Sequence, residues 1–169
     1  MGNAFDKEVS LNFSEDELKK LYEKFKQLDK DGSGTLEPHE FFDVPELAYN
    51  PIVQRVIDVF DKNKDCKISF TEFVQGLSTL HSDSAPEAKL KFAFSIYDIN
   101  NDGYISNGDL FKVLKMMVGS NLTDIQIQQL VDRTILQADK DFDGMISYPE
   151  FCEMVKSLEI EKKLNFNEI

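Results

Sequence analysis

The chain has 169 residues, of which 41% are apolar, and its formal net charge at pH 7 is −12. This length and apolar content suffice for one large hydrophobic core or two small ones. The negative charge argues against general attraction to nucleic acid or to an anionic membrane, so no nucleic-acid partner is expected. No apolar run approaches the roughly 18 residues of a membrane span. Because Cys66 and Cys152 form no disulfide framework or zinc-site pattern, the expected location is the cytoplasm.

The amino terminus carries a candidate lipidation site. Gly2 follows Met1, as N-myristoylation requires, whereas Asp6 stands where the usual pattern has serine or threonine. The alternative is an ordinary terminal segment without an acyl group. Contact with a membrane, and partial membrane association, is expected only if Gly2 is acylated.

The first helix is predicted to begin at Ser14, because Ser14 and Glu17 form a capping-box pattern and apolar residues follow at helical spacing. Residues 29–40 then place oxygen-bearing groups at alternate positions, with a glycine sixth and a glutamate twelfth. Ca²⁺ takes six to eight oxygen ligands, and a turning backbone with alternate acidic residues can wrap around it. The predicted ligands of this first loop are Asp29, Asp31, Ser33, the Thr35 carbonyl, Glu37 and Glu40. Pro45 is expected to cut the following helix short.

A second loop of the same kind follows a helix that Asn50 and Pro51 are expected to cap. It occupies residues 61–72, and its predicted ligands are Asp61, Asn63, Asp65, the Lys67 carbonyl, Ser69 and Glu72. Cys66 replaces the glycine, and left-handed backbone at such a residue costs about 1–2 kcal/mol. We therefore predict that this site binds calcium about tenfold more weakly, since about 1.4 kcal/mol is a factor of ten.

The polar stretch 81–86 is interpreted as a linker between two lobes, residues 1–84 and 85–169. The third loop, residues 98–109, has as predicted ligands Asp98, Asn100, Asp102, the Tyr104 carbonyl, Ser106 and Asp109. Its twelfth position holds aspartate instead of glutamate. The shorter side chain predicts a smaller cage and a shift of the third site toward Mg²⁺.

The helix over 110–118 is apolar on more than one face and is expected to stop at Gly119. Met116, Met117 and Val118 cannot all face one core. Either a tail that begins at Glu159 covers them, or they form a surface for a permanent partner. A second capping-box pattern, Thr123 with Gln126, is expected to start the next helix.

The fourth loop, residues 139–150, matches the pattern at every key position. Its predicted ligands are Asp139, Asp141, Asp143, the Met145 carbonyl, Ser147 and Glu150. Four such loops identify the chain as an EF-hand protein. The expected fold is all-α, with four helix–loop–helix units in two paired lobes. A short two-stranded ribbon is expected in each lobe, joining Leu36 to Ile68 and Ile105 to Ile146, and up to four Ca²⁺ are expected.

An enzyme is not expected. The chain has two histidines, no Gly-x-Ser-x-Gly or phosphate-binding loop, and carboxylates that are committed to metal cages. Three binding functions remain: a calcium buffer, a free sensor that grasps amphipathic helices when calcium binds, and a dedicated subunit of one partner.

Residues 92–98, 102–108 and 114–119 resemble the calcineurin B family, as do residues 45–47, 50–51, 53–58 and 151–152. The resemblance extends from about Phe13 to Lys163. It implies a non-catalytic regulatory subunit that confers calcium sensitivity on a protein serine/threonine phosphatase. In this family an apolar groove holds an amphipathic helix of the catalytic subunit, and the glycine that matches Gly2 is myristoylated.

The resemblance also implies that the amino-terminal pair of sites is the weaker, regulatory one and that the carboxy-terminal pair is mostly structural. It implies a surface for immunophilin–drug complexes, bound through the heterodimer, over Leu114, Met116, Met117, Val118, Asn121 and Leu122. The alternatives are a calmodulin-like free calcium sensor and a calcineurin B homologous protein. The latter usually has degenerate amino-terminal loops, whereas the first loop here is complete.

Overall fold

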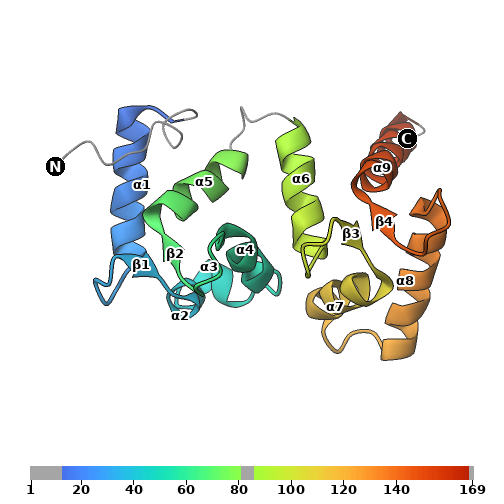
Figure 1. Cartoon of the computed structure of the whole chain (residues 1–169), viewed down its shortest axis with the longest axis horizontal. Coiled ribbons are helices and arrows are strands. Elements are labelled where there is room, and N and C mark those ends of the chain that lie inside the picture. Colours follow the sequence, from blue (N-terminus) through green and yellow to red (C-terminus); the bar gives the residue numbers. More distant parts are fainter. Residues whose placement is uncertain (1–12, 81–85, 168–169) are drawn as a thin grey trace. The chain divides into compact units, whose positions relative to one another are not determined.

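The computed structural model describes residues 13–80 and 86–167, with side chains as far as residue 158. The chain divides into two units, residues 1–92 and 93–169, and each is described by itself. Both units are mainly helical, and each contains one two-stranded antiparallel sheet within the described residues. The expected fold class is therefore confirmed (Figure 1).

In the first unit the elements follow the helix–loop–helix order predicted for two consecutive loops. They are α1 (Glu15–Leu28), β1 (Thr35–Leu36), α2 (Pro38–Phe42), α3 (Pro45–Ala48), α4 (Val53–Phe60), β2 (Ile68–Ser69) and α5 (Phe70–Leu80). Helix α6 (Pro86–Tyr97) contains the boundary between the units. The second unit continues with β3 (Tyr104–Ile105), α7 (Asn107–Val118), α8 (Asp124–Ala138), β4 (Ile146–Ser147) and α9 (Tyr148–Asn167).

Local sequence signals set several of the helix ends. Ser14 and Glu17 form the capping box of α1, and Thr123 and Gln126 form that of α8, as predicted. α7 stops before Gly119, whose φ is +57°. α2 ends at Phe42 and a separate short helix starts at Pro45, which agrees with the predicted effect of the proline.

Two helix ends differ from expectation. The Asn50 side chain accepts a hydrogen bond from the Ile52 N–H at 3.1 Å, but regular helix begins only at Val53, because the Val53 N–H closes a tighter turn onto the Asn50 carbonyl. The chain also stays helical beyond Glu159, as far as Asn167. Residues 159–167 include no glycine or proline, and the glutamate, lysine and leucine among them favour helix. No helix in the described parts of the chain combines the length and apolarity that a membrane crossing requires.

The ribbons form in the predicted register. Leu36 pairs with Ile68, and Ile105 pairs with Ile146. All four side chains are at most 1% exposed. Each ribbon therefore ties two loops together and anchors them in the core of their unit.

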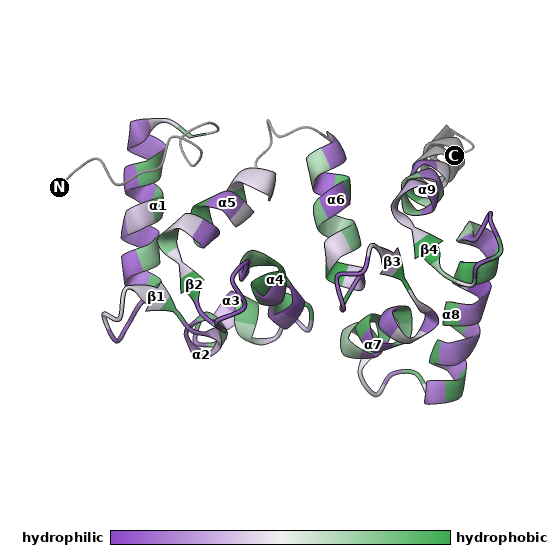
Figure 2. Cartoon of the chain, viewed as in Figure 1, coloured by the Kyte–Doolittle hydropathy of each residue, from purple (hydrophilic) through white to green (hydrophobic). Residues whose placement is uncertain are grey.

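Aromatic side chains build both cores. In the first unit the Phe25 ring lies edge-on to Phe70 and Phe73, with centroids 5.4 and 5.6 Å apart. In the second unit Phe94 contacts Phe151 in the same way at 5.6 Å. Such edge-to-face pairs add to the burial of the rings. Figure 2 shows that the loops after α4 and α8 are hydrophilic, whereas the short strands carry hydrophobic residues.

Candidate metal centres

Four carboxylates of one loop converge between α8 and α9. They offer one oxygen each, all within 4.8 Å of one another, from Asp139, Asp141, Asp143 and Glu150. Glu150 reaches back from the first turn of α9, where its Oε1 accepts the Lys140 N–H at 2.9 Å. Gly144 has a φ of +80°, which a residue without Cβ adopts freely, and its N–H donates to Asp139 at 2.8 Å. The fourth predicted site is thus assembled from its acidic residues.

One atom of this loop tests whether a cation fits. Asp139 Oδ1 is buried and has no hydrogen-bond partner among the described residues. Leaving such an oxygen unpaired is costly, so native structures nearly always pair it. A hard cation held by the four carboxylates would supply the missing partner. The residues therefore fit Ca²⁺.

The first loop gathers three carboxylates. Asp29, Asp31 and Glu40 each place one oxygen within 4.8 Å of the others. Glu40 is 1% exposed and accepts the N–H groups of Lys30 and Glu37, both at 2.9 Å, so it ties the start of the loop to its end. This is the same reach that Glu150 makes in the fourth loop.

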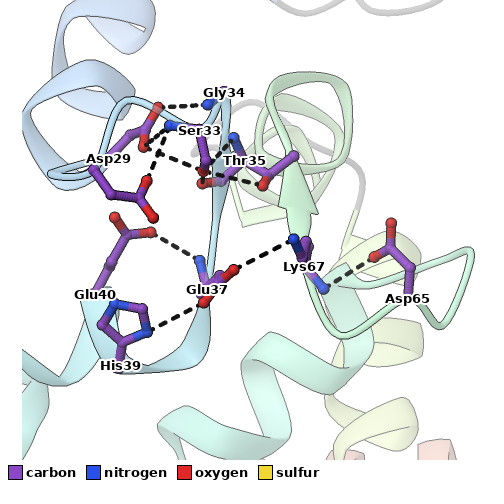
Figure 3. Close-up of polar contacts among 10 residues, drawn as sticks. Asp29, Ser33, Gly34, Thr35, Glu37, His39, Glu40, Asp65 and Lys67 are labelled. Atoms are coloured by element: carbon purple, nitrogen blue, oxygen red, sulfur yellow. Dashed lines mark hydrogen bonds and ion pairs between the residues drawn. The ribbon is translucent and has the colours of Figure 1, made fainter.

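Two predicted ligands of the first loop, the Thr35 carbonyl and the Glu37 carboxylate, face different parts of the structure. The Thr35 carbonyl accepts the Ser33 hydroxyl at 2.9 Å, inside the loop. The Glu37 carboxylate is instead turned toward His39, 3.4 Å from its Nδ1, and toward Lys67, 3.3 Å from its Nζ. Figure 3 shows Glu37 between these two partners. Glu37 therefore stands apart from the carboxylate cluster.

The second loop adopts the backbone conformation of the EF-hand motif, but its carboxylates do not lie close together. Cys66 has a φ of +64°, so it takes the left-handed conformation that was expected to carry a cost. The Lys62 N–H donates to Glu72 at 3.1 Å, and the Asn63 amide donates to Asp65 at 3.2 Å. No three carboxylates of this loop lie within 4.8 Å of one another in the described structure.

The third loop shows the effect of the shorter closing residue. Asp109 accepts the Ser106 N–H at 3.1 Å within a capping box. It accepts no N–H from the start of its own loop, in contrast to Glu40, Glu72 and Glu150 in the described loops. The carboxylates of this loop also form no set of three within 4.8 Å among the described residues.

The environments shift individual pKa values in opposite directions. Burial raises the pKa of Asp98, although hydrogen bonds from Gly103 and Asp102 oppose it. Burial would also raise the pKa of Glu150, but the N–H groups of Ser147 and Lys140 outweigh it and the pKa is lowered. Hydrogen bonds to the charged form of Glu150 keep it ionised, and a carboxylate must be ionised to bind a cation.

The candidate partner surface divides into separate parts. Leu114 lines an apolar hollow of about 380 Å³ together with residues of α6, α8 and α9. Met116 and Met117 are 41% and 45% exposed. Val118 is half-buried and Asn121 is exposed, whereas Leu122 lines another hollow beside Leu130. The proposed cover for Met116, Met117 and Val118, residues 159–169, has side chains outside the described structure, and Gly2 lies outside the described residues.

The role of the Lys67 side chain was missed by sequence reasoning, which considered only its carbonyl. A signal was available, because pairing Leu36 with Ile68 brings the next residues in register, Glu37 and Lys67, opposite each other. An acidic and a basic residue at those positions form a cross-strand pair.

Comparison with known proteins places this architecture in a family. The model of the EF-hand domain pair matches residues 18–78 and 87–156, so the chain is a calcium-binding protein built from two EF-hand pairs. The type 1 calcineurin B protein of Dictyostelium discoideum is 59% identical over 157 residues, which cover 92% of this chain and 87% of the relative. The human type 2 calcineurin B protein is 55% identical over 166 residues, which cover 97% and 98%.

The chain belongs to the calcineurin B family. The resemblance seen in the sequence is therefore confirmed, as is the expectation of a non-catalytic regulatory subunit.

Proposed function

We propose that this chain holds the catalytic subunit of calcineurin in the apolar hollow of its second unit and makes that enzyme responsive to calcium. The family membership implies the partner. The observation that carries the proposed mode of binding is the hollow itself, about 380 Å³ and lined by Tyr97, Leu114, Phe151 and other apolar residues. A concave apolar surface between helices is the shape that receives one face of an amphipathic helix.

The calcium ligands are proposed from the loop positions. The first and fourth loops gather their carboxylates, which supports Ca²⁺ at both. Asp109 does not span its loop, which supports a third site with a smaller cage and a greater preference for Mg²⁺. Four ions is the upper limit set by the number of loops. We propose residues 1–84 and 85–169 as the two functional pairs.

The binding mode is tested by a pair of substitutions. Leu114→Asp places a charge in the hollow, whereas Leu136→Asp places one on α8 at a side chain that is 81% exposed. We expect Leu114→Asp to weaken the complex with purified catalytic subunit at least tenfold, because one buried charge costs several kcal/mol. Leu136→Asp is the matched control and leaves affinity unchanged. Equal affinities of both variants for the catalytic subunit would refute the proposal that the hollow binds it.

The same binding assay separates a dedicated subunit from a free sensor. We expect the complex to persist both with Ca²⁺ and with chelator, while phosphatase activity rises only with Ca²⁺. Association that occurs only with Ca²⁺, and with many different helices, would instead indicate a calmodulin-like sensor. Circular dichroism of each free variant checks that the fold is intact.

Finer parts of the proposal have their own tests. Exposed Met116 and Met117 support a docking surface for immunophilin–drug complexes on the heterodimer. A double substitution of these residues to serine would weaken that docking while phosphatase activity is kept.

We also propose that the chain acts in the cytoplasm and that Gly2 is myristoylated. Mass spectrometry after co-expression with an N-myristoyltransferase, followed by vesicle sedimentation, tests acylation and membrane contact.

A further inference from the structure

The charge of the second loop sets it apart from the other three. The first, third and fourth loops each carry a formal net charge of −3. In the second loop three acidic residues are balanced by three lysines, Lys62, Lys64 and Lys67, so the net charge is zero. A divalent cation that enters this loop is attracted less strongly than in the other three, since the Coulomb repulsion from the lysines opposes the attraction to the carboxylates.

Two of these lysines are held in place by hydrogen bonds or ion pairs. Lys64 Nζ donates to the carbonyl of Asp58, in the last turn of α4, at 2.6 Å. A cation at the carboxyl end of a helix also interacts favourably with the helix dipole. The second loop is thereby fastened to its entering helix without any ion.

The other lysine joins the two loops. Lys67 Nζ lies 3.3 Å from Glu37 Oε1, across the end of the β1–β2 ribbon (Figure 3). The second unit has the same ribbon and offers an internal comparison. There the corresponding residues in register are Ser106 and Met145, which carry no charge. The ion pair is therefore a feature of the first unit's sequence and not of the ribbon geometry.

The first carboxylate of the second loop accepts hydrogen bonds from the backbone of the same loop. Both oxygens of Asp61 accept N–H groups, from Asp65 at 3.2 Å and from Cys66 at 2.9 Å. The contrast is Asp139 in the fourth loop, where one buried oxygen has no partner in the described structure. Asp29 of the first loop also has both oxygens hydrogen-bonded, by Ser33 at 3.0 Å and Gly34 at 2.8 Å. What separates the second loop from the first and fourth is therefore that its carboxylates do not gather in the described structure and that its lysines balance their charge. On these two grounds its residues fit a calcium ion less well.

We propose that the second loop is a calcium-independent clasp, in which Lys67 pairs with Glu37 in place of a second ion, and that the first unit responds to a single ion bound in the first loop. This rests on the proposed function, because it specifies how the calcium response of the first unit is set. A single ion in the first unit removes cooperativity between its paired loops, so the step that involves the first loop follows a Hill coefficient near one.

The first experiment counts ions on the full chain. Equilibrium dialysis against radioactive calcium without magnesium, combined with native mass spectrometry, gives the number of ions bound. Glu40→Gln and Glu72→Gln make the same change at the twelfth position of the first and second loops. We expect three ions for the natural chain, two for Glu40→Gln and three for Glu72→Gln.

A second experiment keeps the proposal testable if Glu72→Gln unfolds. Lys67→Gln removes the positive charge that lies beside Glu37, a predicted ligand of the first loop. For a charge that acts over roughly 10 Å, Coulomb's law at a water-like dielectric then raises calcium affinity in the first loop about threefold to fivefold. Lys112→Gln, at an exposed lysine of α7, is the matched control and leaves that affinity unchanged. The binding step concerned is identified as the one that Glu40→Gln abolishes.

Each outcome decides something. Three ions, no ion lost in Glu72→Gln and a tighter first loop in Lys67→Gln support the clasp. Four ions, or one ion lost in Glu72→Gln, overturn the clasp and leave the calcium-regulated subunit intact. Equal first-loop affinity in Lys67→Gln and Lys112→Gln overturns the role of the ion pair. Absence of any calcium binding by the natural chain overturns the proposed function and the clasp together.

Discussion

Gly76 on α5 is predicted to be irreplaceable for a steric reason. A Cβ added at Gly76 would lie 2.6 Å from three ring carbons of Phe60, whereas carbon atoms in contact are normally about 3.5–4.0 Å apart. Phe60 is 5% exposed and belongs to the core of the first unit with Phe25 and Phe73, so its ring has no free space into which to move.

The size of the effect follows from two opposing contributions. Overpacking a core costs about 1–3 kcal/mol, and replacing glycine by alanine within a helix returns about 0.5–1 kcal/mol. We therefore expect Gly76→Ala to lower the free energy of unfolding of the first unit by about 1–2 kcal/mol. For a unit of this size, about 1 kcal/mol lowers Tm by about 4–8 °C.

Thermal unfolding in the presence of chelator, followed by circular dichroism, measures this loss. Gly108→Ala is the matched control, because Gly108 is also helical and a Cβ there meets nothing closer than the Ser106 hydroxyl at 3.9 Å. The control is expected to match or slightly exceed the natural chain. A Gly76→Ala protein as stable as the natural one would show that the Phe60 ring can yield and would refute the steric argument.

Three further predictions concern the loops. Asp109→Glu lengthens the closing side chain so that it can span the third loop as Glu40 spans the first. Calorimetric titration is expected to show that Ca²⁺ binding tightens relative to Mg²⁺ binding. An unchanged ratio of the Ca²⁺ and Mg²⁺ affinities would contradict the argument that the shorter Asp109 makes a smaller cage. Cys66→Gly removes the strain of a left-handed backbone at φ +64°. With chelator present, urea unfolding is expected to show a free energy of unfolding higher by about 0.5–1 kcal/mol, after the cost of added glycine flexibility. A lower free energy of unfolding would contradict the assignment of strain to Cys66. Glu150→Gln is expected to remove one calcium ion per chain in native mass spectrometry, with Glu153→Gln, exposed on the same helix, as control; retention of that ion would exclude Glu150 as a ligand.

Several features were predictable because they depend on residues close together in the chain. The capping boxes at Ser14 and Thr123 each involve residues three positions apart. Gly144 and Glu150 act within a single twelve-residue loop. The pairing of position 8 between loops is non-local, but it followed from the repeat of the motif.

The predicted helix boundaries were wrong where the local sequence signals were ambiguous. Asn50 does hydrogen-bond forward, yet the helix begins at Val53 because a tighter turn forms first. α9 continues to Asn167 because no residue in its expected tail interrupts a helix. In both cases the type of element was right and its boundary was wrong.

The amino-acid sequence by itself determined the helices, the four loops, the ribbon register and the family, since each depends on spacings of a few residues or on repetition of one motif. Only the tertiary structure decided which groups meet across the fold. It turned Glu37 toward Lys67, left one oxygen of Asp139 without a partner, and placed Leu114 in a hollow while Met116 stays exposed. These outcomes depend on how segments distant in the chain pack together, and packing is set by the combined shape and charge of many side chains.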